Sequence, residues 1–377
     1  MTSRRAERAP IARAPIAVVY GTRPEIVKLA GVLRELGPRA RGIHTGQHYS
    51  PALSEVFLTQ LRVDPPAVRL EVGGASRGRQ IADALACLDQ EFERHRPAAV
   101  VVQGDTNAAL AGALAANARE IPLVHIEAGL RSFDRAMPEE HNRVVVDHLA
   151  DLCCAPTETS RQHLLAEGIA DERVVVTGNT VVDVVPEILP DAEERRALVA
   201  AHGVETDGFV LATFHRPENV DVAEVLAVIL DELAALPAPV LLPLHPRTAA
   251  RAEAFGLGAK LRRLQVVDPL GYREFLGLAA ASGLLVSDSG GVQEEASVIK
   301  RPVVVVRNST ERPEVQGTFA ELVAPGPEIG AVARRWWAEL ADVHARLAAT
   351  PSPYGEGDAS ARSVAALDDL LRRRSAS

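Results

Sequence analysis

The chain reads Gly283-Leu284-Leu285-Val286-Ser287-Asp288-Ser289-Gly290-Gly291-Val292-Gln293-Glu294-Glu295 at its most informative point. An apolar run, a tight Ser/Gly turn and a helix-forming segment follow one another, which predicts a strand, a turn and a helix. Because the first N–H groups of a helix lack backbone partners and carry partial positive charge, such a helix start suits a phosphate. Adjacent glycines let a diphosphate approach the backbone closely, and a carboxylate further along the helix could hold a ribose diol. The stretch therefore predicts a nucleotide diphosphate site, with an ordinary Gly-rich turn as the alternative.

Continuous runs of Val, Ile and Leu recur along the whole chain. Runs that do not alternate with polar residues indicate strands buried on both faces, as in a parallel sheet. The predicted strands are Ile16–Tyr20, Ala99–Val102, Leu123–Ile126, Leu152–Ala155 and Val174–Val176 in the first half, and Val210–Phe214, Val240–Leu244, Leu264–Val267, Leu284–Val286 and Val303–Val306 in the second. Amphipathic segments such as Arg79–Arg94 and Ala108–Arg119 lie between them. We therefore predict an α/β fold with two Rossmann-like domains that face a cleft.

Two domains also fit the length of 377 residues, because a single domain usually has about 100–200 residues. Residues 1–14 are rich in Arg, Ala and Pro and lack an apolar core, so we expect a disordered tail there rather than a secretory signal. The first domain is expected to span residues 15–185 and the second residues 186–355, with a hinge near Asp183–Asp191. Residues 356–377 would form a last helix and a tail that could pack back on the first domain.

The composition argues against several classes of partner. The formal net charge of -9 is unfavourable for a nucleic-acid surface, and no segment approaches the roughly 20 apolar residues of a membrane span. The three cysteines, Cys87, Cys153 and Cys154, form no CxxC pair and fit a reducing compartment. We expect a cytoplasmic protein without nucleic-acid or membrane partners.

Polar clusters follow most of the predicted strands. In an open α/β sheet, ligands bind beyond the carboxyl ends of the strands, so these clusters are candidate ligand contacts. Arg23 lies in one of them and could bind a phosphate through its guanidinium group, with Lys28 one turn beyond Pro24. Asp105 and Glu127 end two further strands and could transfer protons. Helix capping and solvent-exposed charge remain the alternatives for each cluster.

A second acidic segment begins a helix at Pro138. Glu139, Arg143 and Asp147 would lie on one face of this helix at a spacing of four residues. As surface ion pairs they would contribute only tenths of a kcal/mol, whereas buried carboxylates would have shifted pKa values and could supply an acid or a base. Both alternatives stay open from the sequence.

Histidines also follow strands. His215 and His245 end two strands of the second half, either as ligand contacts or as helix caps. Four potential metal ligands lie close together in the first half: His125, Glu127, His141 and His148. The sequence contains neither HExxH nor CxxC nor a compact carboxylate triplet, so we expect no metal.

Taken together, these segments resemble the non-hydrolysing UDP-N-acetylglucosamine 2-epimerases. The resemblance runs in order from about residue 16 to 324. The matching segments are GTRPE (21–25), TGQH (45–48), QGDT (103–106), HIEAGLRS (125–132), MPEEHNR (137–143), TGNTVVD (177–183), HRPEN (215–219), SDSGGVQEE (287–295) and TERPE (310–314). One such motif is weak, whereas eight or more in the same order are specific.

The resemblance implies a GT-B-like pair of Rossmann domains with a UDP-sugar in the cleft. It also implies inversion at C2 of the sugar without a nicotinamide or other cofactor, by elimination of UDP to a glycal and re-addition, which converts UDP-GlcNAc to UDP-ManNAc. Carried over by position, the expected UDP contacts are Arg23, Ser289, Gly290, Gly291 and Glu295. The expected catalytic groups are the acid/base candidates Asp105, Glu127 and Glu139, His215 near the phosphates, and the positioned charges Lys28 and Arg143. A homodimer is the expected assembly.

Two segments depart from the family pattern. After TGQH the chain continues with Tyr49-Ser50-Pro51, which puts activation by a second UDP-sugar in doubt. After TERPE it continues with Val315-Gln316-Gly317-Thr318-Phe319, which leaves the sugar less certain than the nucleotide. The rival functions are a hydrolysing epimerase that releases ManNAc and UDP, a GT-B glycosyltransferase, and a non-catalytic nucleotide-sugar sensor that would lack the carboxylates.

Overall fold

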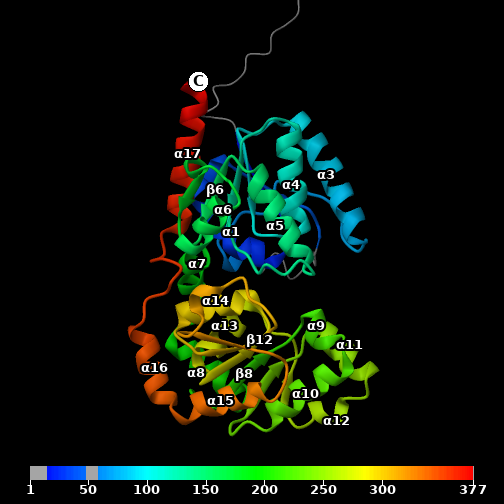
Figure 1. The fold of residues 1–377 in the computed structure, drawn as a ribbon, viewed down its shortest axis with the longest axis vertical. Helices are drawn as coiled ribbons and strands as arrows, with labels where there is room; N and C mark the ends of the chain where they lie inside the picture. Colours follow the sequence, from blue (N-terminus) through cyan, green and yellow to red (C-terminus); the bar gives the residue numbers. More distant parts are fainter. Residues whose placement is uncertain (1–14, 48–57, 377) are drawn as a thin grey trace, which may run out of the picture. The chain divides into compact units, whose positions relative to one another are not determined.

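The computed structural model describes residues 15–47 and 58–376 (Figure 1). The chain divides into two compact units. The first contains the residues up to Val184 and those from Tyr354 onward, and the second contains Val185–Pro353. The chain first passes from one unit to the other inside helix α7 (Val181–Ile188). The expected tail at residues 1–14, His48 of the TGQH motif and Tyr49-Ser50-Pro51 lie outside the described residues.

Each unit is built on one parallel sheet. The first sheet has the strand order β3-β2-β1-β4-β5-β6-β7, and the second has the order β10-β9-β8-β11-β12-β13. The first-unit strands are β1 (Ile16–Tyr20), β2 (Ala40–His44), β3 (Val68–Arg69), β4 (Ala99–Gln103), β5 (Leu123–Ile126), β6 (Leu152–Ala155) and β7 (Val174–Val176). The second-unit strands are β8 (Val210–Thr213), β9 (Val240–Pro243), β10 (Gln265–Val267), β11 (Leu284–Ser287), β12 (Val303–Val306) and β13 (Ala320–Val323). Neighbouring strands in both sheets pair in parallel, so the predicted α/β class with two Rossmann-like sheets is confirmed.

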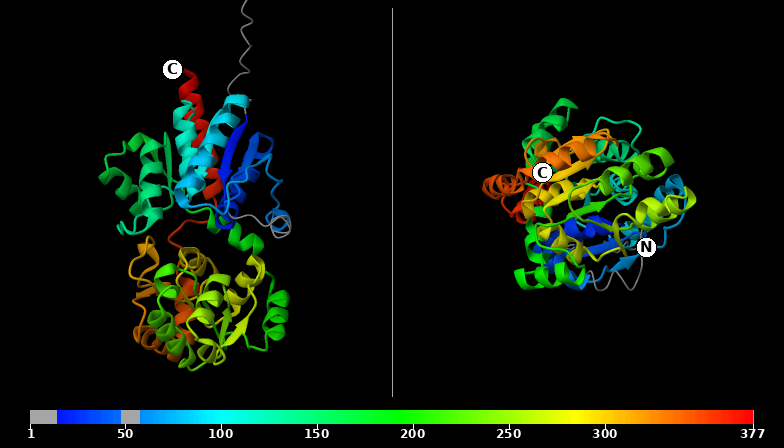
Figure 2. Two further views of the ribbon diagram at one scale, coloured as in Figure 1. Left: turned by 90° about the vertical axis from the view of Figure 1, so that its right-hand side faces the viewer. Right: turned by 90° about the horizontal axis from the view of Figure 1, so that it is seen from below.

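Helices flank each sheet (Figure 2). Those of the first unit are α1 (Arg23–Leu36), α3 (Arg77–Arg94), α4 (Asn107–Ala118), α5 (Pro138–Leu149), α6 (Glu158–Ala166) and α17 (Ala359–Ala376), with short 3-10 turns at Gly37–Arg39 and Asp171–Arg173. Those of the second unit are α8 (Ala192–Ala201), α9 (Pro217–Val220), α10 (Ala223–Ala234), α11 (Pro246–Ala254), α12 (Gly258–Leu261), α13 (Tyr272–Ala281), α14 (Gly290–Ile299), α15 (Glu328–Ala338) and α16 (Leu340–Ala349), with a 3-10 turn at Pro313–Val315. Within the described part of the chain, no helix combines the length and the apolar composition that crossing a bilayer requires.

The continuous apolar runs correspond to strands that are covered on both faces. All residues of β1, β4, β5 and β6 are buried. The alanine-rich helix α4 packs against them at Gly112, where an added Cβ would lie only 2.9 Å from Val102 and 3.2 Å from Val19. This close packing fixes the carboxyl ends of β1 and β4, which carry two of the predicted clusters.

Three strands were not predicted, because they carry too few apolar residues. Strand β2 contains Arg41 and buries only its last two residues, β3 has two residues, and β13 contains Glu321. The ten strands that were predicted agree with the structure to within one residue at each end. Hydrophobic runs therefore locate the central strands better than those toward the sheet edges.

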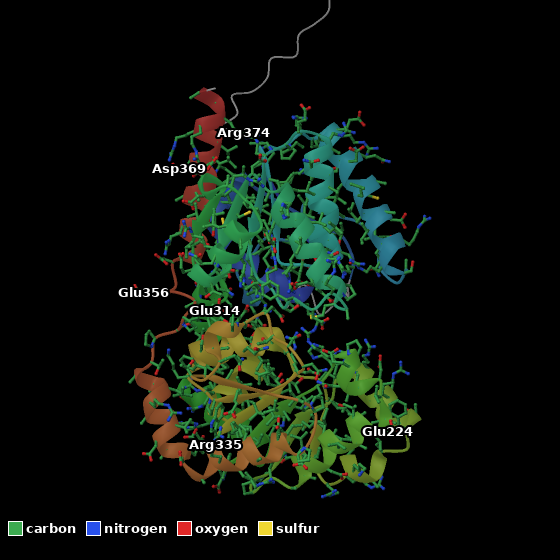
Figure 3. All side chains as sticks on the ribbon, in the orientation of Figure 1. Glu224, Glu314, Arg335, Glu356, Asp369 and Arg374 are labelled. Atoms are coloured by element: carbon green, nitrogen blue, oxygen red, sulfur yellow. The ribbon has the colours of Figure 1, made fainter. Side chains whose placement is uncertain are left out.

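The C-terminal helix α17 packs on α1 within the first unit (Figure 1). The carboxylate of Asp183 accepts the N–H groups of Ala359 and Ser360 at 3.2 and 2.6 Å, and so caps the start of α17. Figure 3 labels Arg374 on the same helix, where it forms an ion pair with Asp151. The TGNTVVD motif, which ends at Asp183, thus anchors the end of the chain to the first unit.

Candidate active site

A buried carboxylate organises the turn after β1. Glu25 is 1% exposed. Its Oε2 atom accepts the N–H groups of Gly21 and Thr22 at 3.0 and 2.8 Å and the Thr22 hydroxyl at 2.8 Å. Its Oε1 atom accepts the hydroxyl of Thr106, beyond the end of β4, at 2.8 Å. Burial outweighs these hydrogen bonds and raises the pKa of Glu25 from its usual 4.5 to about 7. The turn after β1 is thereby tied to the turn after β4.

The predicted phosphate contact Arg23 is the first residue of α1. Its side chain is exposed, and Pro24 follows it as the second residue of the helix. The guanidinium is thus presented from a turn whose backbone is held by Glu25. Contact with a phosphate stays a prediction.

Asp105 follows β4 and is paired with Arg143 of α5. The Nε and Nη2 atoms of Arg143 both donate to Asp105 Oδ2, Nε at 3.1 Å, while Nη1 donates to Glu140 at 2.5 Å. The side-chain amide of Asn142 donates to the backbone carbonyl of Asp105 at 2.8 Å. Since 27% of the Asp105 side chain is exposed, this carboxylate is held in place and yet accessible to a ligand.

Glu127 follows the neighbouring strand β5 and forms a buried ion pair with Lys28 of α1. Its backbone has a φ of 68°, a conformation that is strained for a non-glycine residue and is common at functional sites. Strands β4 and β5 pair in parallel, with Gln103 opposite Ile126. Asp105 and Glu127 therefore follow neighbouring strands at the same edge of the first sheet.

Helix α5 (Pro138–Leu149) does not present Glu139, Arg143 and Asp147 as one set of paired side chains. Arg143 and Asp147 have side chains that are 3% and 0% exposed, so the alternative of surface ion pairs is wrong for them. Arg143 pairs with Glu140 rather than Glu139, because Glu140 is buried three residues before it, whereas Glu139 is exposed. Glu140 also accepts the N–H of Ser132 at 3.0 Å and holds the segment between β5 and α5. An acid or base role for Glu139 stays a prediction.

In the second unit, Asp288 holds the turn after β8. This residue follows the neighbouring strand β11 and is fully buried. Its Oδ2 atom accepts the N–H groups of His215 and Arg216 at 3.1 and 2.9 Å. The same oxygen accepts the side-chain amide of Asn219 at 3.1 Å. Asp288 thereby holds the backbone of the turn that follows β8.

His215 lies at the end of β8 beside Asp288. Its Nδ1 atom is 3.2 Å from Asp288 Oδ1, and burial lowers the pKa of His215 although the Asp288 charge acts in the opposite direction. A neutral ring that donates from Nδ1 keeps Nε2 as an acceptor, which can take up a proton when an anion binds nearby. The neighbouring His245 accepts the N–H of Arg247 at 3.2 Å, as a cap of α11. The capping alternative is thus confirmed for His245.

The start of α14 has the features of an anion site. Ser289 is its N-cap residue, and within the described part of the chain the Ser289 hydroxyl makes no capping bond to the helix. A Cβ added at Gly291 would lie 3.8 Å or more from its neighbours, whereas one at Gly290 would meet Glu311 and Arg312 at 3.0 and 3.1 Å. One glycine therefore permits close packing behind the helix start, and the other leaves space where a phosphate could approach the backbone.

Glu295 lies further along α14 and is held by a tyrosine. The hydroxyl of Tyr272, the first residue of α13, donates to Glu295 Oε1 at 2.8 Å. Burial raises the pKa of Tyr272, and the Glu295 charge raises it further, so the phenol stays a donor. The adjacent Glu294 is fully buried and accepts Arg312 at 2.8 Å, so it packs inside the unit and leaves Glu295 as the candidate ligand contact.

Three partners of the candidate groups were not predicted from the sequence: Glu140, Asp288 and Tyr272. Asp288 could have been recognised, because it stands directly after a strand among polar residues. Tyr272 could not, because it lies 23 residues before Glu295 in an ordinary helix.

The histidines near β5 do not form a metal site. Among the residues that the structure describes, no group of three or more His, Cys, Asp or Glu side chains is arranged to hold a metal ion. His125 instead bonds to Asp147 and to the carbonyl of Gly104. Cys153 and Cys154 are free and buried in β6, where burial raises the pKa of both thiols.

Known proteins resemble the chain over both units. A sequence profile described as UDP-N-acetylglucosamine 2-epimerase matches residues 35–368. A UDP-N-acetylglucosamine 2-epimerase of Methanococcus maripaludis is 40% identical over 319 residues, which cover 82% of this chain and 87% of that protein. A UDP-2,3-diacetamido-2,3-dideoxy-D-glucuronate 2-epimerase of Pseudomonas aeruginosa is 36% identical over 324 residues, which cover 83% of this chain and 87% of that protein.

A solved structure shows the same likeness. The crystal structure of the Methanocaldococcus jannaschii UDP-GlcNAc 2-epimerase in complex with UDP-GlcNAc and UDP has a TM-score of 0.83 and 36% identity to this chain. The match covers 94% of this chain and 99% of that one, which confirms the GT-B-like fold. The profile, the sequence identity and the fold agree, and the chain belongs to the UDP-N-acetylglucosamine 2-epimerase family.

Proposed function

We propose that this protein catalyses the reversible inversion of C2 in UDP-GlcNAc, giving UDP-ManNAc, by elimination and re-addition of UDP. The observation that carries the proposal is the pair of carboxylates on neighbouring strand ends. Asp105 is held by Arg143 after β4, and Glu127 is held by Lys28 after β5. Two carboxylates fixed by different cations are suited to removing a proton from one face of a carbon and returning it to the other.

The chemistry explains why a leaving group must depart. The hydrogen on C2 is not acidic in the intact sugar, so a base alone cannot remove it. If the C1–O bond breaks, UDP leaves with the bonding electrons, and loss of the C2 proton then forms a C1=C2 double bond. Return of a proton to the other face of C2 and attack of the UDP oxygen on C1 restore the glycosidic bond. Atoms and charge balance without a redox partner.

The second unit would hold the diphosphate during this cycle. The start of α14 offers backbone N–H groups and two glycines. Arg23 is a phosphate contact by the family resemblance, through its guanidinium. His215 would gain a proton as negative charge builds on the departing UDP, because an anion beside the ring favours the charged imidazole. Glu295, fixed by Tyr272, would bind the ribose hydroxyls.

One observation supports a second candidate substrate. The relative from Pseudomonas aeruginosa, named for a UDP-2,3-diacetamido-2,3-dideoxy-D-glucuronate substrate, is 36% identical to this chain. The relative named for UDP-N-acetylglucosamine is 40% identical over a similar length. UDP-GlcNAc is therefore our first candidate, and the diacetamido sugar is the second.

Proton NMR of the purified protein with each UDP-sugar in D₂O tests the proposal. We expect UDP-ManNAc to appear from UDP-GlcNAc with deuterium at C2. Free ManNAc and UDP would identify a hydrolysing epimerase instead. Exchange with the diacetamido sugar alone would reassign the substrate. If neither sugar shows turnover or C2 exchange, the proposed reaction is wrong, and transfer to glycosyl acceptors becomes the next assay.

We also propose a homodimer in the cytoplasm. The dimer follows from the family resemblance, and the location is supported by the free cysteines Cys87, Cys153 and Cys154. Light scattering at several concentrations would test the assembly, and a monomer at micromolar concentration would contradict it. Fractionation of the producing cell would test the location.

A further inference from the structure

A buried histidine is bonded next to the turns that carry the two candidate carboxylates, Asp105 and Glu127, and is not used in the mechanism above. His125 belongs to β5 and is fully buried. Its Nε2 atom lies 2.9 Å from the carbonyl oxygen of Gly104, and its Nδ1 atom lies 2.6 Å from Asp147 Oδ1. A carbonyl oxygen can only accept, so Nε2 must carry a proton.

Asp147 accepts the second proton of the ring. Burial alone would raise the pKa of Asp147, but His125 and Arg131 lower it overall, so Asp147 is a carboxylate and can only accept. Arg131 lies 2.7 Å from the other Asp147 oxygen and also binds Glu167 through two nitrogens at 2.7 and 2.6 Å. The exposed His148 lies 3.7 Å from Glu167. A doubly protonated His125 thus belongs to a cluster of two positive and two negative groups. The positive groups are His125 and Arg131, and the negative groups are Asp147 and Glu167.

This cluster holds the backbone on both sides of the site. The Gly104 carbonyl that His125 binds immediately precedes Asp105, in a turn where Gly104 has a φ of 66°. The other oxygen of Asp147 accepts the N–H of Gly129 at 3.1 Å, two residues after Glu127. One buried ion pair therefore connects the turn that carries the first carboxylate to the turn that carries the second.

Helix α5 reinforces the same connection. Asp147 lies one turn after Arg143, which binds the Asp105 carboxylate directly. The helix thus holds Asp105 by its side chain through Arg143, and by the preceding carbonyl through Asp147 and His125. An apolar side chain at position 125 would fill the core without the desolvation cost of a buried ion pair, so the ionic arrangement points to a positional role.

We propose that His125 is a positioning residue that sets the relative placement of Asp105 and Glu127 for proton transfer at C2. This inference rests on the proposed epimerisation. His125 itself does not touch the substrate. It acts by donating from one ring nitrogen to the Asp105 turn and from the other to the carboxylate that holds the Glu127 turn.

The test compares His125→Phe and His125→Gln with wild type. The phenylalanine removes both donors, whereas the glutamine amide can still donate to one acceptor. We expect kcat for C2 exchange to fall about 100-fold in His125→Phe, as for a misplaced catalytic group, and to recover in part in His125→Gln. The dissociation constant of UDP, measured by calorimetry, should change by less than about 3-fold, because none of the residues proposed to bind the diphosphate is bonded to His125. An unchanged kcat in a folded His125→Phe protein would overturn the proposal.

His344→Phe is the matched control. His344 of α16 donates from Nε2 to the carbonyl of Gly283 at 2.8 Å, and its Nδ1 lies 3.3 Å from the Arg301 guanidinium, so it is a histidine of the second unit that also binds a backbone carbonyl. We expect its loss to leave kcat for C2 exchange within about 3-fold of wild type. An equal loss of kcat in His344→Phe and His125→Phe would mean that general destabilisation is responsible, and would overturn the positioning role.

Two measurements on ligand-free protein separate this inference from the reaction itself. The Gly129 amide should exchange with D₂O faster in His125→Phe than in wild type, because its acceptor Asp147 loses the His125 donor. Nitrogen NMR of the wild type should show protons on both ring nitrogens of His125. A single protonated nitrogen, or unchanged exchange at Gly129, would overturn the inference. Failure of the wild type to turn over any UDP-sugar, with both measurements as expected, would overturn the proposed function instead.

Discussion

The two units solve one structural problem in different ways. The first strand of each unit is followed, after a short turn, by the same three residue types. They are Arg23-Pro24-Glu25 after β1 and Arg216-Pro217-Glu218 after β8. Both turns bury N–H groups that need an acceptor. In the first unit the acceptor is Glu25 of the same motif, which is 1% exposed. In the second unit it is Asp288, which follows the neighbouring strand β11, and the Glu218 side chain is 39% exposed.

The difference separates the chemistry of the two strand ends. In the first unit, Glu25 also binds Thr106, so the edge of the sheet is filled by paired side chains, among them Asp105 and Glu127. In the second unit, the Asp288 side chain accepts N–H groups of the turn after β8. The next residues are Ser289, Gly290 and Gly291, whose side chains are small or absent. We interpret the strand ends of the first sheet as a proton-transfer site and those of the second sheet as an anion-binding site.

The largest expected effect concerns the carboxylates of the first unit. Asp105→Asn and Glu127→Gln should each lower kcat by about 10²- to 10⁴-fold, because each removes a proton-transfer group while keeping its shape. UDP affinity should stay within about 3-fold of wild type in both. C2 exchange by NMR and calorimetry with UDP measure the two quantities. Turnover near the wild-type level in both variants would remove these residues from the mechanism. Glu158→Gln, an exposed position on α6, is the control.

The next effect concerns the buried carboxylate of the second unit. Asp288→Ala should lower the free energy of unfolding by about 3–5 kcal/mol, because it leaves the N–H groups of His215 and Arg216 buried without an acceptor. Urea denaturation followed by tryptophan fluorescence would report on this unit, which contains Trp336 and Trp337. A midpoint equal to that of wild type would show that the turn does not depend on Asp288.

Glu25 should make stability depend on pH. Its folded-state pKa of about 7 lies above the usual 4.5, so its contribution to stability is fully present below about pH 4.5 and is lost as pH rises through 7. The difference amounts to about 3 kcal/mol at 1.36 kcal/mol per pKa unit. Glu25→Gln should remove this slope, since its amide can accept from the turn and donate to Thr106. Urea titrations of both proteins from pH 4.5 to 8 test this, and identical slopes would refute it.

Glu295 should affect binding more than chemistry. Glu295→Gln should weaken UDP binding by about 10-fold, equivalent to about 1.4 kcal/mol, because the charged acceptor for the ribose is lost. Its kcat at saturating UDP-sugar should change by less than about 3-fold. Calorimetry and NMR turnover again give the two numbers. A fall in kcat with unchanged UDP affinity would place Glu295 with the chemistry of the first unit and break the comparison.

The smallest expected effect is at Glu218, the counterpart of Glu25. Glu218→Gln should change the free energy of unfolding by less than about 0.5 kcal/mol at any pH from 4.5 to 8, because the side chain is exposed and is 3.9 Å at the nearest from its Arg216 neighbour. Urea titration alongside Glu25→Gln makes the contrast direct. A pH slope as large as that of Glu25 would mean that the two motifs serve the same purpose.

The sequence predicts the central strands and the polar strand ends well, because both depend on local residue types. The runs at β1 and β12 are continuous and apolar, whereas β2 and β13 contain charged residues and were not predicted. Asp105 and Glu127 were found because each lies within two residues of the end of a strand.

Pairings between distant residues are not visible in the sequence. Arg143 and Asp105 are 38 residues apart, and Lys28 and Glu127 are 99 apart. Local spacing even suggested the wrong partner for Arg143, because Glu139 and Glu140 both lie about one turn before it on α5 and only burial distinguishes them. Which carboxylate is buried is decided by the packing of α5 against the sheet, and a single helix pattern carries no information on that.

One experiment tests the central claim most directly. UDP-GlcNAc carrying ¹⁸O between C1 and the β-phosphorus would be incubated with the protein in D₂O and followed by phosphorus and proton NMR. The account predicts that deuterium enters C2 while the label spreads from the bridge to the other oxygens of the β-phosphate. Inversion that keeps the original hydrogen at C2, with the label still in the bridge, would contradict it.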